Sequence, residues 1–291
     1  MTITLKNELL TVTIDDMGAQ LCSVVNTAGS EYIWQADPAV WGRHAPLLFP
    51  VIGRLQNGQY TVDGETYSIS AHGFARDSRF EVREQSDTRV VFTLTDSPET
   101  LKVYPFAFSL CVIYELSGNQ LKKSCRVENR SSREMYYELG GHDGFCIPNG
   151  ESMDDYAIVL PGLDPILPYG MDAQCMITPK DQPITPPNGR IPLKPMPSYG
   201  LDTIILDAPP ARTAQLVNKE GQPRVTLEFA DYDYLGLWTM DIPTDTNYIC
   251  IEPWTTLPDA TFVGRALADK QGIRTLAPNA SEIISYTTTF H

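Results

Sequence analysis

The sequence is poor in positive charge. It has 22 Lys and Arg residues against 36 Asp and Glu, which gives a formal net charge of -14 and an isoelectric point near 4.6. Nucleic acids and anionic membranes are bound by cationic surfaces. The charge balance therefore argues against either as the main partner, and it is compatible with a neutral small-molecule ligand.

Long hydrophobic runs are also missing. No segment approaches the ~18 apolar residues that a membrane-spanning helix needs. The N-terminal stretch MTITLKNELLTVTIDDMG lacks the basic and then apolar regions of a secretory signal. The six cysteines form no CxxC pair, and several lie in apolar runs where reduced buried thiols are expected. Together these features predict a cytoplasmic protein.

The familiar cofactor motifs are absent too. The chain has no GxGxxG, no P-loop, no HExxH and no GxSxG. Only four histidines occur, and their spacing gives no particular support to a metal site. We therefore expect no cofactor and no bound metal.

What the sequence has in abundance is two-residue alternation of apolar and polar side chains, bounded by turn residues, which predicts strands. Asp63-Gly64 between two such runs is a strong hairpin signal. The predicted strands are 2–6, 9–14, 20–25, 60–69, 79–84, 89–95, 108–116, 120–129, 203–206, 214–217, 224–229, 234–240, 248–252 and 282–290.

Helical patterns are few and short. They cover 97–102, after Ser97-Pro98, and roughly 259–269, where Asp259 could cap the helix. So many strands with so few helices predict an all-β fold, a large β-sandwich over a single domain of residues 1–291. Residues 161–200 hold ten of the 23 prolines, too many for a continuous strand ladder. Strand-like sequence continues on both sides, so we interpret them as a long excursion within that domain.

Glu252 is the one carboxylate in the apolar run YICIEPW, residues 248–254. In a strand, Glu252 shares a face with Tyr248 and Trp254, while the intervening isoleucines point to the other face. An aromatic wall with a carboxylate is typical of a sugar site, because sugar C–H faces pack on rings and hydroxyls need hydrogen-bond partners. Trp238 in LGLWT would extend that wall. A buried Glu paired with an Arg is the alternative.

Two histidines lie at the ends of strand-like segments next to glycines. They are His72 in AHGFAR and His142 in GGHDGF. Glycines beside a strand end allow a ligand to approach closely, although they also make ordinary turns. For both residues a structural role stays open. His44 is expected to be structural or to lie at a rim.

Six motifs in order resemble those of the aldose 1-epimerase (galactose mutarotase-like) superfamily. The resemblance covers about residues 3–290 and is closest to bacterial aldose epimerase-like proteins. Gly53 stands where true galactose mutarotases have Asn, so one sugar contact of those enzymes is missing. The motifs are FPVIGR, HGFAR, GGHDGF, LDTIIL, LGLWT and IEPW.

The resemblance implies a large β-supersandwich and an isomerase, an aldose 1-epimerase or mutarotase, that acts on a hexose without a cofactor. It implies that Glu252 is the general base and His142 the general acid. It also implies that Arg54, His72 and Asp202 contact the sugar. We expect two further contacts, from Trp238 in the aromatic wall and from Arg76 in the HGFAR motif.

These roles require that the surroundings of the base and the acid push their pKa values apart, so that the base is ionised while the acid is protonated. We expect Glu252 to stay ionised near Arg54 or backbone donors. We expect His142 to be protonated with help from an anionic neighbour, Asp143 or Glu138. The partner is then a small-molecule sugar, and the protein is a monomer or homodimer.

Two other functions remain open at this stage. Arg43, Arg54, Arg76 and Arg79 could converge on a phosphate, which would favour a hexose-6-phosphate epimerase, or they could pair with acids such as Asp77. A non-catalytic carbohydrate-binding module would keep the Trp and Arg contacts without needing both an acid and a base.

Overall fold

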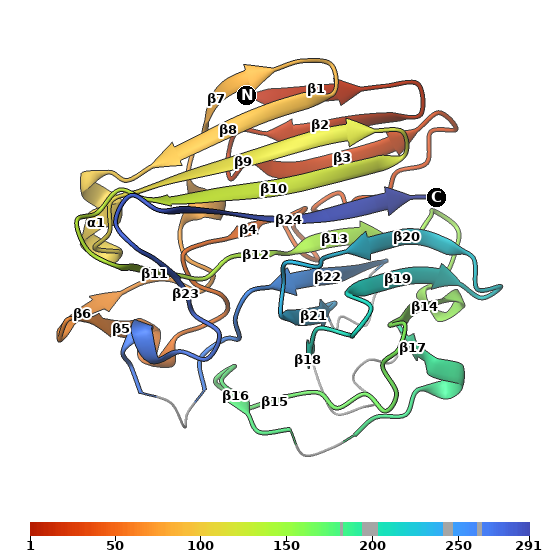
Figure 1. Ribbon diagram of the computed structural model, residues 1–291. Helices are drawn as coiled ribbons and strands as arrows, with labels where there is room; N and C mark the ends of the chain where they lie inside the picture. The colour runs from red at the N-terminus through yellow and green to blue at the C-terminus, as the bar shows by residue number, and fades with distance from the viewer. Residues whose placement is uncertain (181–182, 194–202, 241–246, 261–263) are drawn as a thin grey trace.

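The computed structural model describes residues 1–180, 183–193, 203–240, 247–260 and 264–291, and antiparallel β-sheets dominate it (Figure 1). The largest sheet has nine strands, and its long central strands bury alternate side chains as the sequence predicts. Its order is β17 (Arg190–Pro192), β14 (Tyr156–Val159), β19 (Thr213–Asn218), β20 (Pro223–Glu228), β24 (Ser281–Phe290), β10 (Gln120–Asn129), β9 (Phe108–Ser117), β8 (Arg89–Thr95) and β7 (Glu81–Gln85).

Two further sheets form the opposite layer. One has three strands, β1 (Thr2–Lys6), β2 (Leu10–Asp15) and β3 (Gln20–Asn26). The other has six: β18 (Thr203–Asp207), β21 (Tyr234–Trp238), β22 (Tyr248–Trp254), β12 (Gly140–Gly141) and β4 (Leu47–Leu48), with β13 (Asp143–Cys146) also paired to β22. Residues 32–34 join the two sheets, because the Tyr32 N–H donates to the Val24 carbonyl of β3 at 3.0 Å and the Cys146 N–H of β13 donates to the Tyr32 carbonyl at 3.0 Å.

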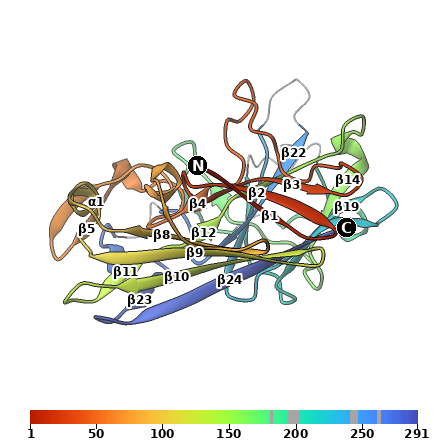
Figure 2. The same cartoon turned by 90° about the horizontal axis from the view of Figure 1, so that it is seen from above.

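The two layers enclose one large apolar core. Seen from above, β1–β3 lie over β8–β10 as a separate layer (Figure 2). Buried tyrosines link the layers: the Tyr114 hydroxyl donates to the Ala19 carbonyl at 2.8 Å, and the Tyr286 hydroxyl donates to Asp143 at 2.7 Å. The predicted all-β sandwich is therefore confirmed.

Short elements complete the fold. The predicted hairpin is present as β5 (Gln59–Val62) and β6 (Glu65–Ser68), with φ of 51° at Asp63 and 84° at Gly64. The helix predicted at 97–102 is present as α1 (Pro98–Val103), capped by Ser97. The other short elements are β11 (Met135–Tyr137), β15 (Gly170–Met171), β16 (Ile177–Thr178), β23 (Arg274–Leu276) and the 3-10 turns η1 (Gln56–Gly58), η2 (Ala75–Asp77), η3 (Met153–Asp155), η4 (Pro187–Gly189) and η6 (Leu267–Asp269).

The helix predicted over 259–269 is wrong. Among the described residues of that stretch only the short turn η6 is helical. Asp259 does not cap a helix, because its carboxylate accepts the Gln56 N–H at 2.9 Å, and Ala260 bridges to Ile177. Contacts with distant segments therefore override the local helical preference.

The proline-rich segment 161–200 is built into both layers where it is described. Ile166 bridges to Ile184, Tyr169 bridges to Ile205 of β18, and β17 forms an edge of the nine-stranded sheet. An edge strand tolerates Pro192 because the missing N–H is not needed there. None of the helices in the described part of the chain is both long and apolar enough to cross a membrane.

Candidate active site

The site is built on β22, an interior strand of the six-stranded sheet. The alternation predicted for this strand is confirmed: Glu252 and Trp254 line a pocket, whereas Ile249 and Ile251 lie in the main core. Glycines on the neighbouring strands make room for Trp254. A Cβ on Gly236 would lie 2.7 Å from the Trp254 ring, and one on Gly140 would lie 2.8 Å from it.

His142 is held between β12 and β13, directly beside β22. Its Nε2 lies 3.3 Å from Oε2 of Glu252, and the two residues are 8% and 1% exposed. The backbone register explains the contact, because Gly140 pairs with Trp254 and Asp143 pairs with Ile251, so the intervening His142 lies next to Glu252. Two titratable residues far apart in the sequence thus lie in contact in a buried position.

Aromatic rings enclose this pair. Trp41 is stacked on the His142 ring with 5.1 Å between centroids and 28° between planes. Trp238 meets the same ring edge-on at 5.6 Å, and His72 does so at 5.6 Å. An apolar wall around a few polar groups is the usual composition of a small-ligand site.

The pocket has a volume of about 390 Å³. It brings together six of the seven residues predicted from the sequence: Glu252, His142, Arg54, His72, Arg76 and Trp238. The seventh, Asp202, lies outside the described residues. The pocket is lined by Trp41, Arg43, Pro46, Gly53, Arg54, Ala71, His72, Arg76, His142, Met171, Cys175, Thr203, Trp238, Met240, Glu252, Trp254 and Pro258.

His72 is fixed in a neutral form. It lies in the left-handed region at φ 64°, its N–H donates to the Gly53 carbonyl at 2.8 Å, and its Nδ1 accepts the Gly53 N–H at 3.2 Å. Burial lowers the pKa of His72 well below its usual value, and His142 and the neighbouring arginines lower it further. The ring hydrogen is therefore on Nε2, which can donate to a ligand.

Three arginines face the pocket, and two of them share one acid. Arg43 lies 2.9 Å from Asp77, and Arg76 lies 3.6 Å from the other oxygen of Asp77. The pKa of Arg76 is lowered by burial and by Arg43. Arg79 pairs with Asp16 instead, so three of the four arginines considered for a phosphate converge.

In the empty pocket, burial opposes the charge states expected for the pair. Burial raises the pKa of Glu252 well above its usual value, and Asp143 adds to this, while Trp254 opposes it. Burial lowers the pKa of His142 to about 3, and Arg76 and Arg43 act in the same direction. A desolvated pocket favours the neutral form of both groups.

The anionic neighbours expected for His142 point elsewhere. Asp143 follows His142 in the chain and turns to the other face, where it accepts the Tyr286 hydroxyl and lies 3.9 Å from Lys123. Glu138 lies 2.5 Å from Lys270 and accepts the Ile52 N–H at 2.5 Å. Neither carboxylate therefore assists protonation of His142.

One group of donors in the described chain has the geometry to hold a metal ion. Ligand atoms of His142, Cys250 and Glu252 all lie within 4.8 Å of one another. Burial raises the pKa of the Cys250 thiol well above its usual value, which disfavours the thiolate that a metal requires. The arrangement is better suited to proton transfer.

Sequence reasoning missed several pocket residues. Trp41 precedes a Gly in a loop, so no periodic pattern marks it. Met171 and Cys175 come from the proline-rich segment, whose role the sequence left open, and they form a wall of the pocket. His44 is structural, as expected, because its Nδ1 contacts the Trp34 carbonyl at 2.7 Å.

Fold and pocket together define a β-sandwich protein of the galactose mutarotase-like class. The family model described as aldose 1-epimerase matches residues 1–264. The chain belongs to the aldose 1-epimerase family.

Individual relatives span the whole length. Protein LacX of Lactococcus lactis subsp. lactis is 30% identical, over 99% of both chains. The structure of a galactose mutarotase related enzyme from Lactobacillus acidophilus is 33% identical, with a TM-score of 0.93 over 100% of this chain and 97% of that one. A galactose mutarotase-like protein from Lactobacillus casei is 32% identical, with a TM-score of 0.91 over 100% of both chains.

Proposed function

We propose that this protein is a mutarotase that interconverts the α and β anomers of a free hexose by acid–base ring opening. The observation that carries the proposal is the Glu252–His142 contact of 3.3 Å, inside an aromatic-walled pocket of about 390 Å³. Relatives described as galactose mutarotase-like support the sugar as the ligand class.

In the proposed reaction Glu252 removes the proton from the anomeric hydroxyl and His142 donates a proton to the ring oxygen. The bond from C1 to the ring oxygen breaks and leaves an aldehyde and a free hydroxyl. Rotation about C1–C2 presents the other carbonyl face, and closure returns both protons to their donors. Each group contributes roughly 10²–10⁴-fold.

The pair needs only one proton in total. Because burial favours the neutral forms, that proton is on Glu252 in the empty pocket, where Oε2 of Glu252 lies 3.3 Å from Nε2 of His142. A sugar hydroxyl that donates to Glu252 stabilises the carboxylate and lowers its pKa. Substrate binding would thus bring the pair into its reactive form.

The remaining predicted residues would position the sugar. Trp238 packs against the C–H face, while Arg54, Arg76 and the Nε2–H of His72 donate to hydroxyls. Asp202 is proposed to contribute as an acceptor, from the resemblance alone. We further propose that the protein works in the cytoplasm without a cofactor, as a monomer or homodimer.

The test is polarimetry of freshly dissolved glucose and galactose with Glu252→Gln and His142→Asn. Both variants should lose most of the catalysed rate and keep the wild-type circular dichroism spectrum. Glu228→Gln and His291→Asn, at exposed positions, are the matched controls. Near-wild-type rates in the first two variants would contradict the acid–base roles. Sugar binding without any catalysed rate in the wild type would favour a non-catalytic carbohydrate-binding protein.

A hexose-6-phosphate 1-epimerase is the second candidate, because Arg43, Arg54 and Arg76 all line the pocket. Arginine forks match phosphate geometry. The shared partner Asp77 offsets part of this charge. A kcat/KM for glucose 6-phosphate far above that for glucose and galactose would favour this candidate.

A further inference from the structure

A charged pair lies in the core directly behind the catalytic pocket. Lys123 of β10 and Asp143 of β13 are each 2% exposed, and Nζ of Lys123 lies 3.9 Å from Oδ1 of Asp143. Neither of these two atoms has a hydrogen-bond partner among the described residues. A buried ion pair of this kind contributes little to stability, because apolar residues of similar volume are often as good or better. Stability alone therefore does not account for the charges at this place.

Asp143 is held in a fixed position beside the reactive pair, Glu252 and His142. The Tyr286 hydroxyl of β24 donates to Oδ2 of Asp143 at 2.7 Å, and a Cβ on Gly141 would lie 2.8 Å from the same hydroxyl oxygen. The residues on both sides of His142 thus pack against Tyr286. In the register of β13 and β22, Asp143 pairs with the residue that precedes Glu252. The two carboxyl groups therefore lie on opposite faces of the same two strands.

Apart from the reactive pair, Lys123 is the one group around Asp143 in the described chain that carries a charge at neutral pH. Burial raises the pKa of Asp143, whereas Lys123 and the Tyr286 hydroxyl lower it and so favour the carboxylate. The other titratable groups around Asp143 and Glu252 are phenols and thiols, and they stay neutral because burial raises the pKa of each. They are Tyr114, Tyr232, Tyr248, Tyr286, Cys125 and Cys250.

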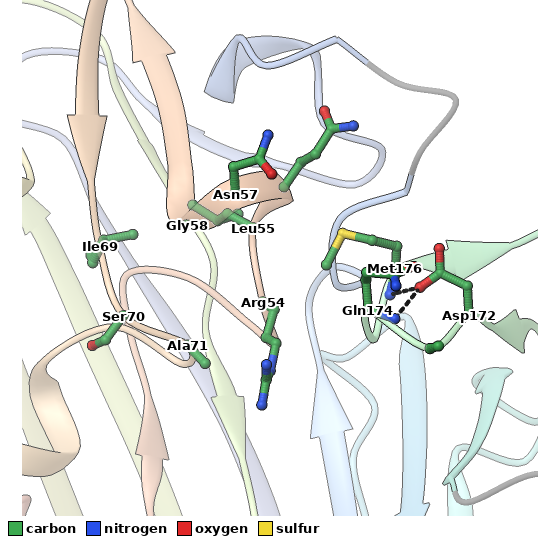
Figure 3. Close-up of a pocket in the computed structure, with 12 residues that line it drawn as sticks. Arg54, Leu55, Asn57, Gly58, Ile69, Ser70, Ala71, Asp172, Gln174 and Met176 are labelled. Carbon is green, nitrogen blue, oxygen red and sulfur yellow. Dashed lines mark hydrogen bonds between the residues drawn. The ribbon is translucent and has the colours of Figure 1, made fainter.

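Three arginines face the reactive pair from the pocket side. Arg43 and Arg76 share Asp77, at 2.9 and 3.6 Å. Arg54 also lines a second cavity, of about 780 Å³ (Figure 3). The ring of His72 is neutral, because burial lowers its pKa. None of these arginines forms an ion pair with the carboxyl group of the reactive pair.

Asp143 is thus an anion fixed beside a carboxyl group that has no cation of its own. A nearby like charge disfavours ionisation. Accordingly, Asp143 raises the pKa of Glu252. We propose that Asp143, with Lys123 as its counter-ion, is a positioning residue that retains the single proton on the Glu252–His142 pair. This inference rests on the proposed mutarotase function and extends its working range toward alkaline pH.

Two variants remove the charge of Asp143 in different ways. Lys123→Met combined with Asp143→Asn removes both charges and keeps an acceptor for the Tyr286 hydroxyl. Lys123→Met alone leaves a buried Asp143 without its cation, so that Asp143 takes up a proton. The matched control is Lys219→Met combined with Asp155→Asn, because this 3.8 Å ion pair is exposed and does not line the pocket.

The direct measurement is a pH titration of the Glu252 carboxyl carbon by NMR, in protein labelled with carbon-13 at the glutamate side-chain carboxyl groups. The Glu252 resonance is the one that is absent from Glu252→Gln. Its midpoint should move to lower pH by about one unit in both variants, the order of effect that one nearby charge has on a buried carboxyl group. It should stay in place in the control. An unchanged midpoint, or one at higher pH, would overturn the inference.

The pH profile of kcat/KM gives the functional readout. The alkaline fall should begin about one pH unit lower in both variants, so that kcat/KM on the falling limb is about tenfold lower at a given pH. The plateau of kcat/KM and the KM for glucose should change by less than about threefold, because the residues proposed to contact the sugar are untouched.

The two measurements separate this inference from the proposed function. If the NMR midpoint moves but the wild type turns over no sugar, retention of the proton by Asp143 stands and the mutarotase function falls. If glucose is turned over while the midpoint and the alkaline limb are unchanged in both variants, the function stands and the role of Asp143 is overturned.

Discussion

Two buried glutamates of this protein lie in different electrostatic surroundings. Glu138 and Glu252 are 0% and 1% exposed, and burial raises the pKa of both. Glu138 lies 2.5 Å from the Lys270 ammonium group, whereas no Lys or Arg of the described residues pairs with Glu252, which lies 3.3 Å from the His142 ring. A carboxyl group paired with a fixed cation stabilises structure, and one paired with a titratable neutral group is available for proton transfer.

Glu138 also helps to build the proposed active site. The Glu138 carboxylate accepts the Ile52 N–H. Ile52 directly precedes Gly53 and Arg54, which line the pocket. Lys270 connects Glu138 to Asp259, which fixes the same loop from the other side. The charged cluster Glu138–Lys270–Asp259 therefore supports the pocket, and within the described part of the chain Glu252 has no such cation as a partner.

The largest effect is expected when the structural pair is broken. Lys270→Met leaves Glu138 and Asp259 without their cation, and the free energy of unfolding should fall by about 3–5 kcal/mol, measured by urea denaturation. Lys219→Met is the control, because its 3.8 Å ion pair with Asp155 is exposed and contributes about 0–1 kcal/mol. Equal losses in both variants would remove the distinction between the two kinds of ion pair.

The pH dependence of catalysis should show the unusual order of pKa values in the reactive pair. The form with one proton on the pair dominates from the lowered pKa of His142, about 3, to the raised pKa of Glu252. We expect kcat/KM to be flat through pH 6.5, the ordinary value of a histidine, and to fall only where Glu252 loses its proton. A decline centred near pH 6.5 in a pH–rate profile would contradict this order.

Removing the reactive carboxyl should stabilise the fold. Folded Glu252 keeps its proton above pH 4.5, where the unfolded chain releases it, so the wild type loses stability as pH rises and Gln does not. Glu252→Gln should gain about 1 kcal/mol at pH 7.5 and almost nothing at pH 4, by urea denaturation.

Glu138→Gln is the matched comparison, and it should be destabilised at pH 7.5 because Lys270 loses its nearest anion. A loss of stability in both variants would show that the two glutamates are not different in kind.

The smallest effect is expected at Cys250, whose thiol lies near the reactive pair without a proposed role. Burial raises the pKa of this thiol, so it stays neutral and cannot replace either group. Cys250→Ala should change kcat/KM by less than about threefold and the free energy of unfolding by about 1 kcal/mol.

Prolonged treatment with a chelator should leave the catalysed rate unchanged. A large loss in either experiment would indicate that the His142–Cys250–Glu252 group binds a functional metal.

Strand-level features of the fold follow from local patterns. Alternation located the strands, Asp63-Gly64 located the hairpin, and Ser97-Pro98 located α1. The helix expected over 259–269 failed because Asp259 finds partners in Gln56 and Lys270, which are distant in sequence. A local pattern carries no information about such partners.

The candidate site was predictable in part. Six motif residues meet in one pocket, but Trp41 was missed because a single aromatic residue in a loop has no pattern. The anionic helper expected for His142 was wrong because sequence neighbours on a strand point to opposite faces, as Asp143 does.

The sequence by itself determined that Glu252 lies on one face of β22 and its isoleucine neighbours on the other, because strand geometry has a period of two. Only the tertiary structure decided that His142 lies beside Glu252, that Trp41 covers it, and that Lys270 pairs with Glu138 instead. The physical reason is that burial and charge pairing, which set the pKa of a carboxyl group, depend on contacts between segments distant in sequence.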